Sequence, residues 1–211
     1  MAMSIPELSA AKPRTPRPSR AEVRDRLIAA AAEVFAAKGY DASSVDDIAR
    51  QAGLTKGAVY SNFDSKDDLF FELLGEKVAE RIALVEALPA SPEPAEAWVR
   101  AVGAALNTAM VEQPEWHVLF IEFWQRSIRD PAARERFVPH RRQLHDLVAK
   151  TIERRADELN LRLPVEPDRL ATAMLGLSNG LAIEYLLDPE SVPPDLFGDI
   201  LASMIVAEDR E

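Results

Sequence analysis

Cysteine is absent from this chain of 211 residues, and glycine is scarce, with eight residues. The absence of cysteine excludes a disulfide scaffold and a cysteine-ligated metal, and it fits a reducing cytosol. Scarce glycine and little strand-like alternation of apolar and polar residues favour an all-α fold. No apolar stretch reaches the length of a membrane span, and the N-terminus carries proline and charge where a signal peptide would be apolar. We therefore expect a soluble, cytoplasmic, all-helical protein.

Motifs for catalysis and metal binding are also missing. The three histidines, His117, His140 and His145, show no metal-ligand spacing, and no Glu-x-x-His pair suggests a di-iron bundle. The chain has neither a phosphate-binding glycine loop nor a G-x-S-x-G elbow. We expect no enzyme, no cofactor and no metal site. An enzyme, or a helical bundle that only binds a small molecule, remains the competing class of function.

Charge is distributed unevenly along the chain. Ten basic and eight acidic residues through residue 66 give a charge of +2, whereas 15 basic and 27 acidic residues after it give −12. The segment from Lys12 to Arg26 holds six basic residues against two acidic ones. A basic N-terminal part and an acidic remainder allow phosphate contact at one end of the protein only.

The stretch from Ser44 to Lys66 predicts two short helices joined by a tight corner. Ser44 can cap the first helix, and Asp47, three residues on, can reach back to it as in a capping box. Gly53 can end this helix because glycine adopts the left-handed conformation without steric penalty. Thr55 can cap the second helix, which would bury Val59.

The second helix of this corner would carry small and polar side chains on its outer face: Lys56, Gly57, Ala58, Ser61 and Asn62. Such a helix can enter the major groove of DNA, because short side chains let its backbone come close. A corner between two helices that has no role in DNA binding also needs a small residue, a glycine and a buried apolar side chain. The spacing alone therefore leaves both interpretations open.

The chain from Arg20 to Leu74 resembles the N-terminal domain of the TetR family of transcriptional regulators. The matching residues, in family order and spacing, are Gly39, Tyr40, Ser44, Ile48, Ala49, Ala52, Gly53, Thr55, Lys56, Gly57, Tyr60, Phe63, Lys66 and Leu69. The resemblance implies a three-helix DNA-binding head and a C-terminal helical bundle that binds an effector and forms a homodimer. It also implies a DNA-binding regulator, commonly a repressor that a small molecule releases from a palindromic operator.

This resemblance assigns roles to residues of the helix-turn-helix. Ser44, Thr55, Tyr60 and Lys66 would position the protein on phosphates, while Lys56, Gly57, Ala58, Ser61 and Asn62 would approach bases. The family often has histidine at the Asn62 position, so the phosphate contact expected there is in question. Arg17 and Arg20 would add phosphate contacts from a basic arm, although the arm could equally be a tail without a role.

Three segments follow from these patterns: a flexible arm over 1–19, a DNA-binding domain over 20–66 and a C-terminal domain over 67–211. The helical period predicts one long helix from Ser65 to about Leu88, which would touch both domains. Further helices are expected over Ala95–Glu112, Glu115–Arg129, Ala132–Leu159, Pro167–Leu187 and Pro194–Glu208. Pro139 should kink its helix or start a new one near His140.

Aromatic residues at helical spacing in the C-terminal domain usually indicate core packing. Because the resemblance implies an effector pocket there, we expect that Met110, Trp116, Phe120, Trp124, Leu175 and Asn179 line it. Ala173, Gly176 and Gly180 form a narrow surface that lets another helix approach closely. The resemblance implies that this surface pairs two copies of the chain, although packing inside a monomer is the alternative.

Overall fold

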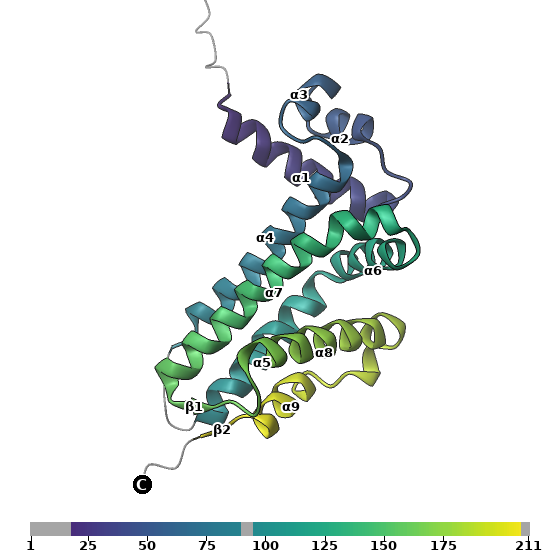
Figure 1. The fold of residues 1–211 in the computed structure, drawn as a ribbon. Coiled ribbons are helices and arrows are strands. Elements are labelled where there is room, and N and C mark those ends of the chain that lie inside the picture. The colour runs from purple at the N-terminus through teal and green to yellow at the C-terminus, as the bar shows by residue number, and fades with distance from the viewer. Residues whose placement is uncertain (1–17, 90–94, 208–211) are drawn as a thin grey trace, which may run out of the picture.

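The computed structural model describes residues 18–89 and 95–207, which fold almost entirely into helices (Figure 1). The first four are α1 (Arg20–Lys38), α2 (Val45–Gln51), α3 (Lys56–Tyr60) and α4 (Lys66–Ala87). The others are α5 (Ala95–Glu112), α6 (Pro114–Arg129), α7 (Pro131–Leu159), α8 (Pro167–Leu187), the short 3-10 helix η1 (Pro189–Ser191) and α9 (Leu196–Met204). The prediction of an all-α fold with a helix-turn-helix is confirmed.

Local capping signals set the ends of the helices in the head, a name we use for α1, α2 and α3. Ser44 and Asp47 form the capping box at the start of α2, and the Thr55 side chain accepts a hydrogen bond from the Ala58 N–H at the start of α3. Gly39 and Gly53 have φ of +76° and +63°, in the region that favours glycine. The corner between α2 and α3 therefore depends on Gly53, as its sequence indicates.

The α4 helix connects the head to the rest of the molecule (Figure 1). Its 22 residues begin at the Ser65 cap and extend for about 33 Å at 1.5 Å per residue. Its first turns bury Leu69, Phe70 and Leu74, whereas most of its side chains beyond Gly75 are partly or fully exposed. One continuous helix thus runs from the head to the far end of the body.

A single apolar cluster joins the head to α4, α6 and α7, and we call it the head-side core. It is rich in aromatic rings: Phe70 stacks on Phe123 with centroids 4.1 Å apart, and Tyr40 packs edge-on against Phe123 at 4.9 Å. Phe123 and Phe70 are fully buried. Because this cluster crosses the expected boundary at residue 66, the head has no core separate from the body.

A second cluster, the cavity-side core, is built from α5, α8 and α9 around Val99, Leu170 and Leu201. In it α5 and α9 approach backbone to backbone. A Cβ added at Gly103 would overlap the backbone of Gly198, and a Cβ added at Gly198 would lie 2.9 Å from the Arg100 carbonyl oxygen. Only glycine fits at this crossing.

The C-terminal end differs from the prediction, and so does one of the two alternatives given for Pro139. The last helix ends at Met204, and the next residues form the short strand β2 (Val206–Ala207), which pairs antiparallel with β1 (Leu161–Arg162). A two-residue strand is too short for its alternation to be visible in a sequence. In addition, α7 continues through Pro139 without a new start at His140.

Candidate nucleic-acid interface and internal cavity

The α2–α3 corner lies at the outer end of the head, away from the body (Figure 1). Ser44, Thr55, Lys56, Gly57, Tyr60 and Ser61 are exposed there, and Tyr60 keeps 50% of its surface accessible. Ala58 and Asn62 are half-buried. Val59 and Phe63 hold α3 to the core, with 1% and 4% exposed. The predicted contact residues of α3 therefore lie on one exposed helix end.

Three arginines of α1 donate hydrogen bonds to backbone carbonyls of this corner. Arg20 and Arg24 donate to the carbonyls of Ser61 and Asn62, and Arg26 donates to the carbonyl of Ala52 at 2.7 Å. These carbonyls lie at the C-terminal ends of α3 and α2, where backbone acceptors lack partners within the helix. The sequence reasoning placed Arg20 on DNA and did not identify Arg24 and Arg26. Arg20 and Arg24 hold the end of α3, and Arg26 holds the end of α2.

The charged residues of the predicted DNA contact set have partners within the chain. The Lys56 ammonium pairs with the Asp46 carboxylate at 2.9 Å, which raises the pKa of Lys56. The Lys66 ammonium donates to the carbonyls of Tyr40 and Ser43, at 2.6 and 2.9 Å, and burial lowers its pKa. Lys66 thus joins α4 to the α1–α2 loop. Arg17 lies outside the described residues.

Asn62 ends α3 in a conformation with one unsatisfied atom. Its amide nitrogen donates to the carbonyl of Ala58 at 2.8 Å and to the hydroxyl of Ser61. Its Oδ1 is buried and accepts no hydrogen bond from the part of the chain that the structure describes. The side chain therefore points back along α3 in the unbound protein.

Tyr40 is the centre of the contact between head and body. Its backbone N–H donates to Glu122 of α6 at 2.6 Å, and its hydroxyl donates to the buried Asp67 at the start of α4. Burial and this hydrogen bond raise the pKa of Tyr40. Arg136 of α7 pairs with Asp67 at 2.8 Å, and Arg126 of α6 lies 3.8 Å from it. Residues of α6 and α7 thus hold the head through one network.

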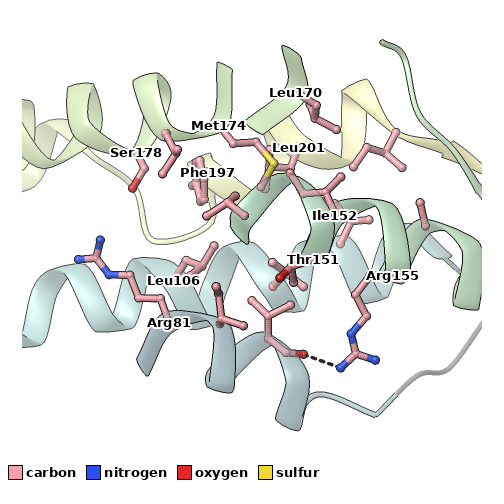
Figure 2. Close-up of a pocket in the computed structure, with 18 of the residues that line it drawn as sticks. Arg81, Leu106, Thr151, Ile152, Arg155, Leu170, Met174, Ser178, Phe197 and Leu201 are labelled. Carbon is pink, nitrogen blue, oxygen red and sulfur yellow. Dashed lines mark hydrogen bonds between the residues drawn. The ribbon is translucent and has the colours of Figure 1, made fainter. Parts of the chain in front are cut away.

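The body encloses an apolar cavity of about 150 Å³ near the far end of α4 (Figure 2). Helices α4, α5, α7, α8 and α9, together with the segments around Leu161 and Ile205, supply its walls, mostly with aliphatic side chains. The lining residues are Val78, Arg81, Ile82, Val85, Trp98, Val99, Val102, Leu106, Val148, Thr151, Ile152, Arg155, Ala156, Leu161, Leu163, Leu170, Met174, Leu175, Ser178, Phe197, Leu201 and Ile205. The volume matches that of cavities which accept one benzene-sized molecule.

Of the six residues predicted to line a pocket, only Leu175 lines this cavity. Trp116 and Phe120 belong to the head-side core, and Met110 packs against Ala182 in a small separate cluster. Trp124 is 36% exposed, and Asn179 is half-buried outside the cavity. The aromatic stripe of α6 therefore packs toward the head, whereas aliphatic side chains of α4, α5 and α7 line the cavity.

Polar groups at the edge of the cavity connect it to α6. The Arg81 guanidinium lies 3.1 Å from Nε2 of His117, which is 3% exposed. Burial, together with the charge of Arg81, lowers the pKa of His117 to about 4. His117 is therefore neutral at pH 7. Spacing in the sequence gave no indication of this pair, because its members lie 36 residues apart.

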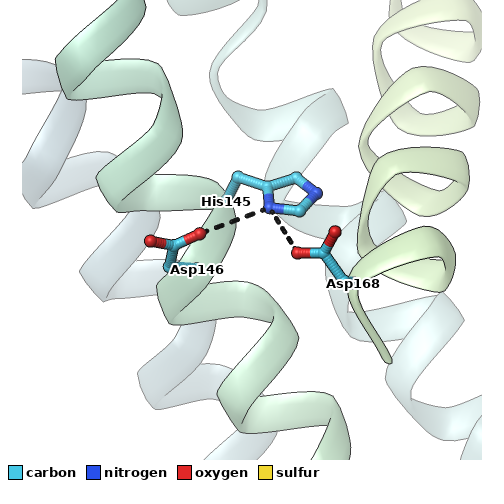
Figure 3. A group of neighbouring side chains, drawn as sticks. All are labelled: His145, Asp146 and Asp168. Atoms are coloured by element: carbon cyan, nitrogen blue, oxygen red, sulfur yellow. Dashed lines mark ion pairs between the residues drawn. The ribbon is translucent and has the colours of Figure 1, made fainter. Parts of the chain in front are cut away.

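A histidine and two carboxylates meet on the surface between α7 and α8 (Figure 3). Nδ1 of His145 lies 3.4 Å from Asp168 and 3.7 Å from Asp146, and its Nε2 contacts the Thr172 hydroxyl at 2.8 Å. The three ligand atoms lie within 4.8 Å of one another, although both aspartates are exposed. The observed contacts join the start of α8 to α7, and we assign no metal to them.

The outer face of α8 is apolar, and no other part of the described chain covers it. Ala173, Gly176 and Gly180 are exposed, and a Cβ added at either glycine would meet no atom within 4 Å. The same stripe continues with Ile183 and Leu187, the latter 79% exposed. Among the described helices, α8 is long and apolar enough to cross a membrane by length and composition, with 17% of that window buried. Its two glycines are therefore not explained by packing within one chain.

Comparison with known proteins agrees with this architecture. Residues 27–73 match the bacterial regulatory proteins of the tetR family, and residues 94–209 match the C-terminal domain of BetI-type transcriptional repressors. The transcriptional repressor AcnR of Corynebacterium diphtheriae is 27% identical over 157 residues, which cover 74% of this chain and 77% of AcnR. The repressor BepR of Brucella suis is 32% identical over 103 residues, covering 48% and 49%.

Solved structures share the fold. A transcriptional regulator from Rhodococcus superposes with a TM-score of 0.63 at 23% identity, covering 86% of this chain and 92% of that one. The regulator FadR of Bacillus subtilis, solved with stearoyl-CoA, gives 0.62 at 17% identity, covering 85% and 95%. The exposed helix-turn-helix, the helical body and the two family matches, which together cover most of the sequence, show that this chain belongs to the TetR family of DNA-binding transcriptional regulators.

Proposed function

We propose that a homodimer of this chain binds a palindromic operator through α3 and represses transcription until a small apolar effector enters the cavity. Continuity of α4 carries this proposal. Its first turns pack in the head-side core, and its Val78, Ile82 and Val85 line the cavity. A ligand that shifts the far half of α4 therefore changes the orientation of the head. The relative FadR was solved with an acyl-CoA, which supports a small-molecule effector for this fold.

DNA contact in this proposal follows the exposure of the corner. Thr55, Tyr60 and Ser44 position the head on phosphates, while Lys56, Gly57, Ala58 and Ser61 face the bases. Asn62 reaches a base only after its amide leaves Ala58. The domain boundaries over 1–19, 20–66 and 67–211 remain part of the proposal, as does a cytoplasmic location. TetR-family regulators are not normally enzymes, and we propose no catalytic role.

Selection of genomic fragments with the purified chain, followed by fluorescence anisotropy on the recovered site, tests operator binding. A recovered palindrome that binds two chains, and binds them far more tightly than a scrambled duplex of equal length, supports the proposal. Recovery of no preferred sequence at several salt concentrations contradicts it, because nonspecific phosphate contact alone falls steeply with salt.

Dimerisation through α8 gives a separate prediction. Gly180→Arg places a charged side chain on the apolar stripe and should convert the dimer to a monomer in sedimentation velocity experiments. Gly75→Arg is the matched control, because Gly75 is also helical and a Cβ there also meets no atom within 4 Å. The control should remain dimeric. A Gly180→Arg variant that sediments as the wild type would exclude this face as the interface.

A further inference from the structure

All charged side chains that line the cavity are positive. They are Arg81 of α4 and Arg155 of α7, and the lining contains no aspartate, glutamate or lysine. The remaining polar lining groups are Thr151, Ser178 and the indole of Trp98. The cavity therefore offers donors and no carboxylate to a guest, which disfavours a cationic ligand.

Arg155 already has carboxylate partners among the described residues, although its buried Nε has no hydrogen-bond partner there. It pairs with Glu86 at 3.1 Å and Glu158 at 3.0 Å, and it donates to the carbonyls of Val85 and Glu86 at the end of α4 (Figure 2). Its charge is thus neutralised, and its donors satisfy the last carbonyls of α4. Arg155 holds the end of α4 to α7.

Arg81 is different. No carboxylate of the described residues lies within 4.0 Å of its guanidinium, and its hydrogen-bond contact is Nε2 of the neutral His117. Because a guanidinium only donates, Nε2 accepts and the proton of His117 is on Nδ1. Burial lowers the pKa of Arg81. Arg81 is partly buried and the charge of Glu80 acts on it only from beyond 4.0 Å, so an anion that entered the cavity and paired with the guanidinium would lower the cost of this charge.

We propose that the cavity binds a small monocarboxylate with an apolar body, whose carboxylate pairs with Arg81. This inference rests on the proposed function and names the chemistry of its effector. The planar fork of a guanidinium matches a carboxylate, and the aliphatic walls match a body of about one benzene ring. Figure 2 places Ser178 toward the same end of the cavity as Arg81, and the Ser178 hydroxyl makes no hydrogen bond within the described chain. It supplies a second donor.

Such a ligand would act on the head through α6. A carboxylate that takes the Arg81 donor leaves Nε2 of His117 without its donor. His117 lies on α6. The same helix carries Glu122, which accepts a hydrogen bond from the Tyr40 N–H, and Arg126, which lies 3.8 Å from Asp67. The Arg81–His117 contact therefore joins the ligand to the helix that positions the head, in addition to the path through α4.

Calorimetry on the full-length protein with benzoate, benzamide and benzylammonium tests the charge preference without any substitution. The three probes share one ring and differ in the charge of its substituent. We expect benzoate to bind about tenfold or more tightly than benzamide, since charge-assisted hydrogen bonds exceed neutral ones, and benzylammonium not to bind. Benzoate that binds no better than benzamide, or does not bind at all, overturns the inference.

Arg81→Gln should reduce benzoate affinity by about tenfold or more and leave benzamide affinity unchanged. Arg141→Gln is the matched control: Arg141 is also partly buried without a carboxylate partner in the described chain, its pKa is lowered by burial, and it does not line the cavity. Equal benzoate affinity in Arg81→Gln and wild type overturns the inference.

The same series measured on operator-bound protein separates the two proposals. Release of DNA by benzamide and benzoate at equal concentrations overturns the carboxylate preference and leaves ligand-controlled DNA binding intact. If the protein has no operator, the proposed function fails while the calorimetry still decides the ligand chemistry.

Discussion

The two cores of this protein differ in how completely they are filled. The head-side core packs rings of Tyr40, Phe70 and Phe123 against one another with centroids 4.1 to 5.6 Å apart. The cavity-side core, built mostly from aliphatic side chains together with Phe197 and Trp98, surrounds a cavity of about 150 Å³. The α4 helix passes along both. A filled core transmits a displacement because interiors have low compressibility, whereas a hollow one can accept a guest. Under the proposed function, the filled half would transmit the signal and the hollow half would sense the ligand.

Removal of a ring from the filled half should have the largest effect. Phe123→Ala deletes a side chain with no exposed surface that contacts four other rings, so it should lower the free energy of unfolding by about 3–5 kcal/mol. Urea denaturation measures this change in the free energy of unfolding. A loss below about 1 kcal/mol would show that the head-side core is not tightly packed.

Acid should weaken the junction between the two cores. Because the pKa of His117 is about 4 in the folded protein and about 6.5 in an unfolded chain, the unfolded state binds the proton first as pH falls. The contribution of neutral His117 is complete above pH 6.5 and is lost progressively down to about pH 4, by at most about 3 kcal/mol. In His117→Gln the decline of stability between pH 6.5 and 5 should be shallower. Parallel pH profiles for the two proteins would contradict this assignment.

The same substitution, alanine to leucine, compares the packing of the two cores directly. Ala31→Leu adds volume where no surface is exposed and should destabilise the protein by about 1–3 kcal/mol. Ala156→Leu adds the same volume beside the cavity and should change stability by less than about 1 kcal/mol, while it blocks ligand binding. Equal destabilisation by the two substitutions would remove the distinction between a filled and a hollow half.

Substitutions on the outer face of α3 should leave both cores unchanged. Lys56→Ala removes an exposed ion pair and Tyr60→Ala an exposed ring, so each should alter stability by less than about 0.5 kcal/mol. Tyr60→Ala should weaken binding to all DNA sequences alike, whereas Lys56→Ala should change sequence preference. Selection on a randomised duplex measures both. Identical selectivity in the two variants would remove the assigned roles.

Helix positions were largely predictable because their signals are local. Ser44, Thr55 and Ser65 cap helices as predicted, and the predicted bounds of Ala95–Glu112 and Pro167–Leu187 match α5 and α8. The sequence also indicated which face of α3 is exposed. In a helix of five residues, burial of Val59 and of the following Phe63 determines which face points outward.

The cavity was not predictable in the same way. Whether Trp116 faces the cavity or the head depends on how α6 packs against α4 and α7, and no local signal sets that packing. Arg81 belongs to no sequence motif. Its proposed role rests on the lack of a carboxylate within 4.0 Å among the described residues, and this depends on how several helices pack around it. Trp116 and Phe120, which were expected to line an effector pocket, fill the core beside the head and do not line this cavity.

The crossing of Gly103 and Gly198 determines which wall of the cavity can adapt. With two backbones in direct apposition, α9 cannot slide over α5 without a steric collision. Phe197 and Leu201, which flank this crossing on α9, therefore form a fixed floor. Under the proposed function, accommodation of guests of different sizes would come from the other walls, on α4, α7 and α8, and a shift of α4 would reach the head.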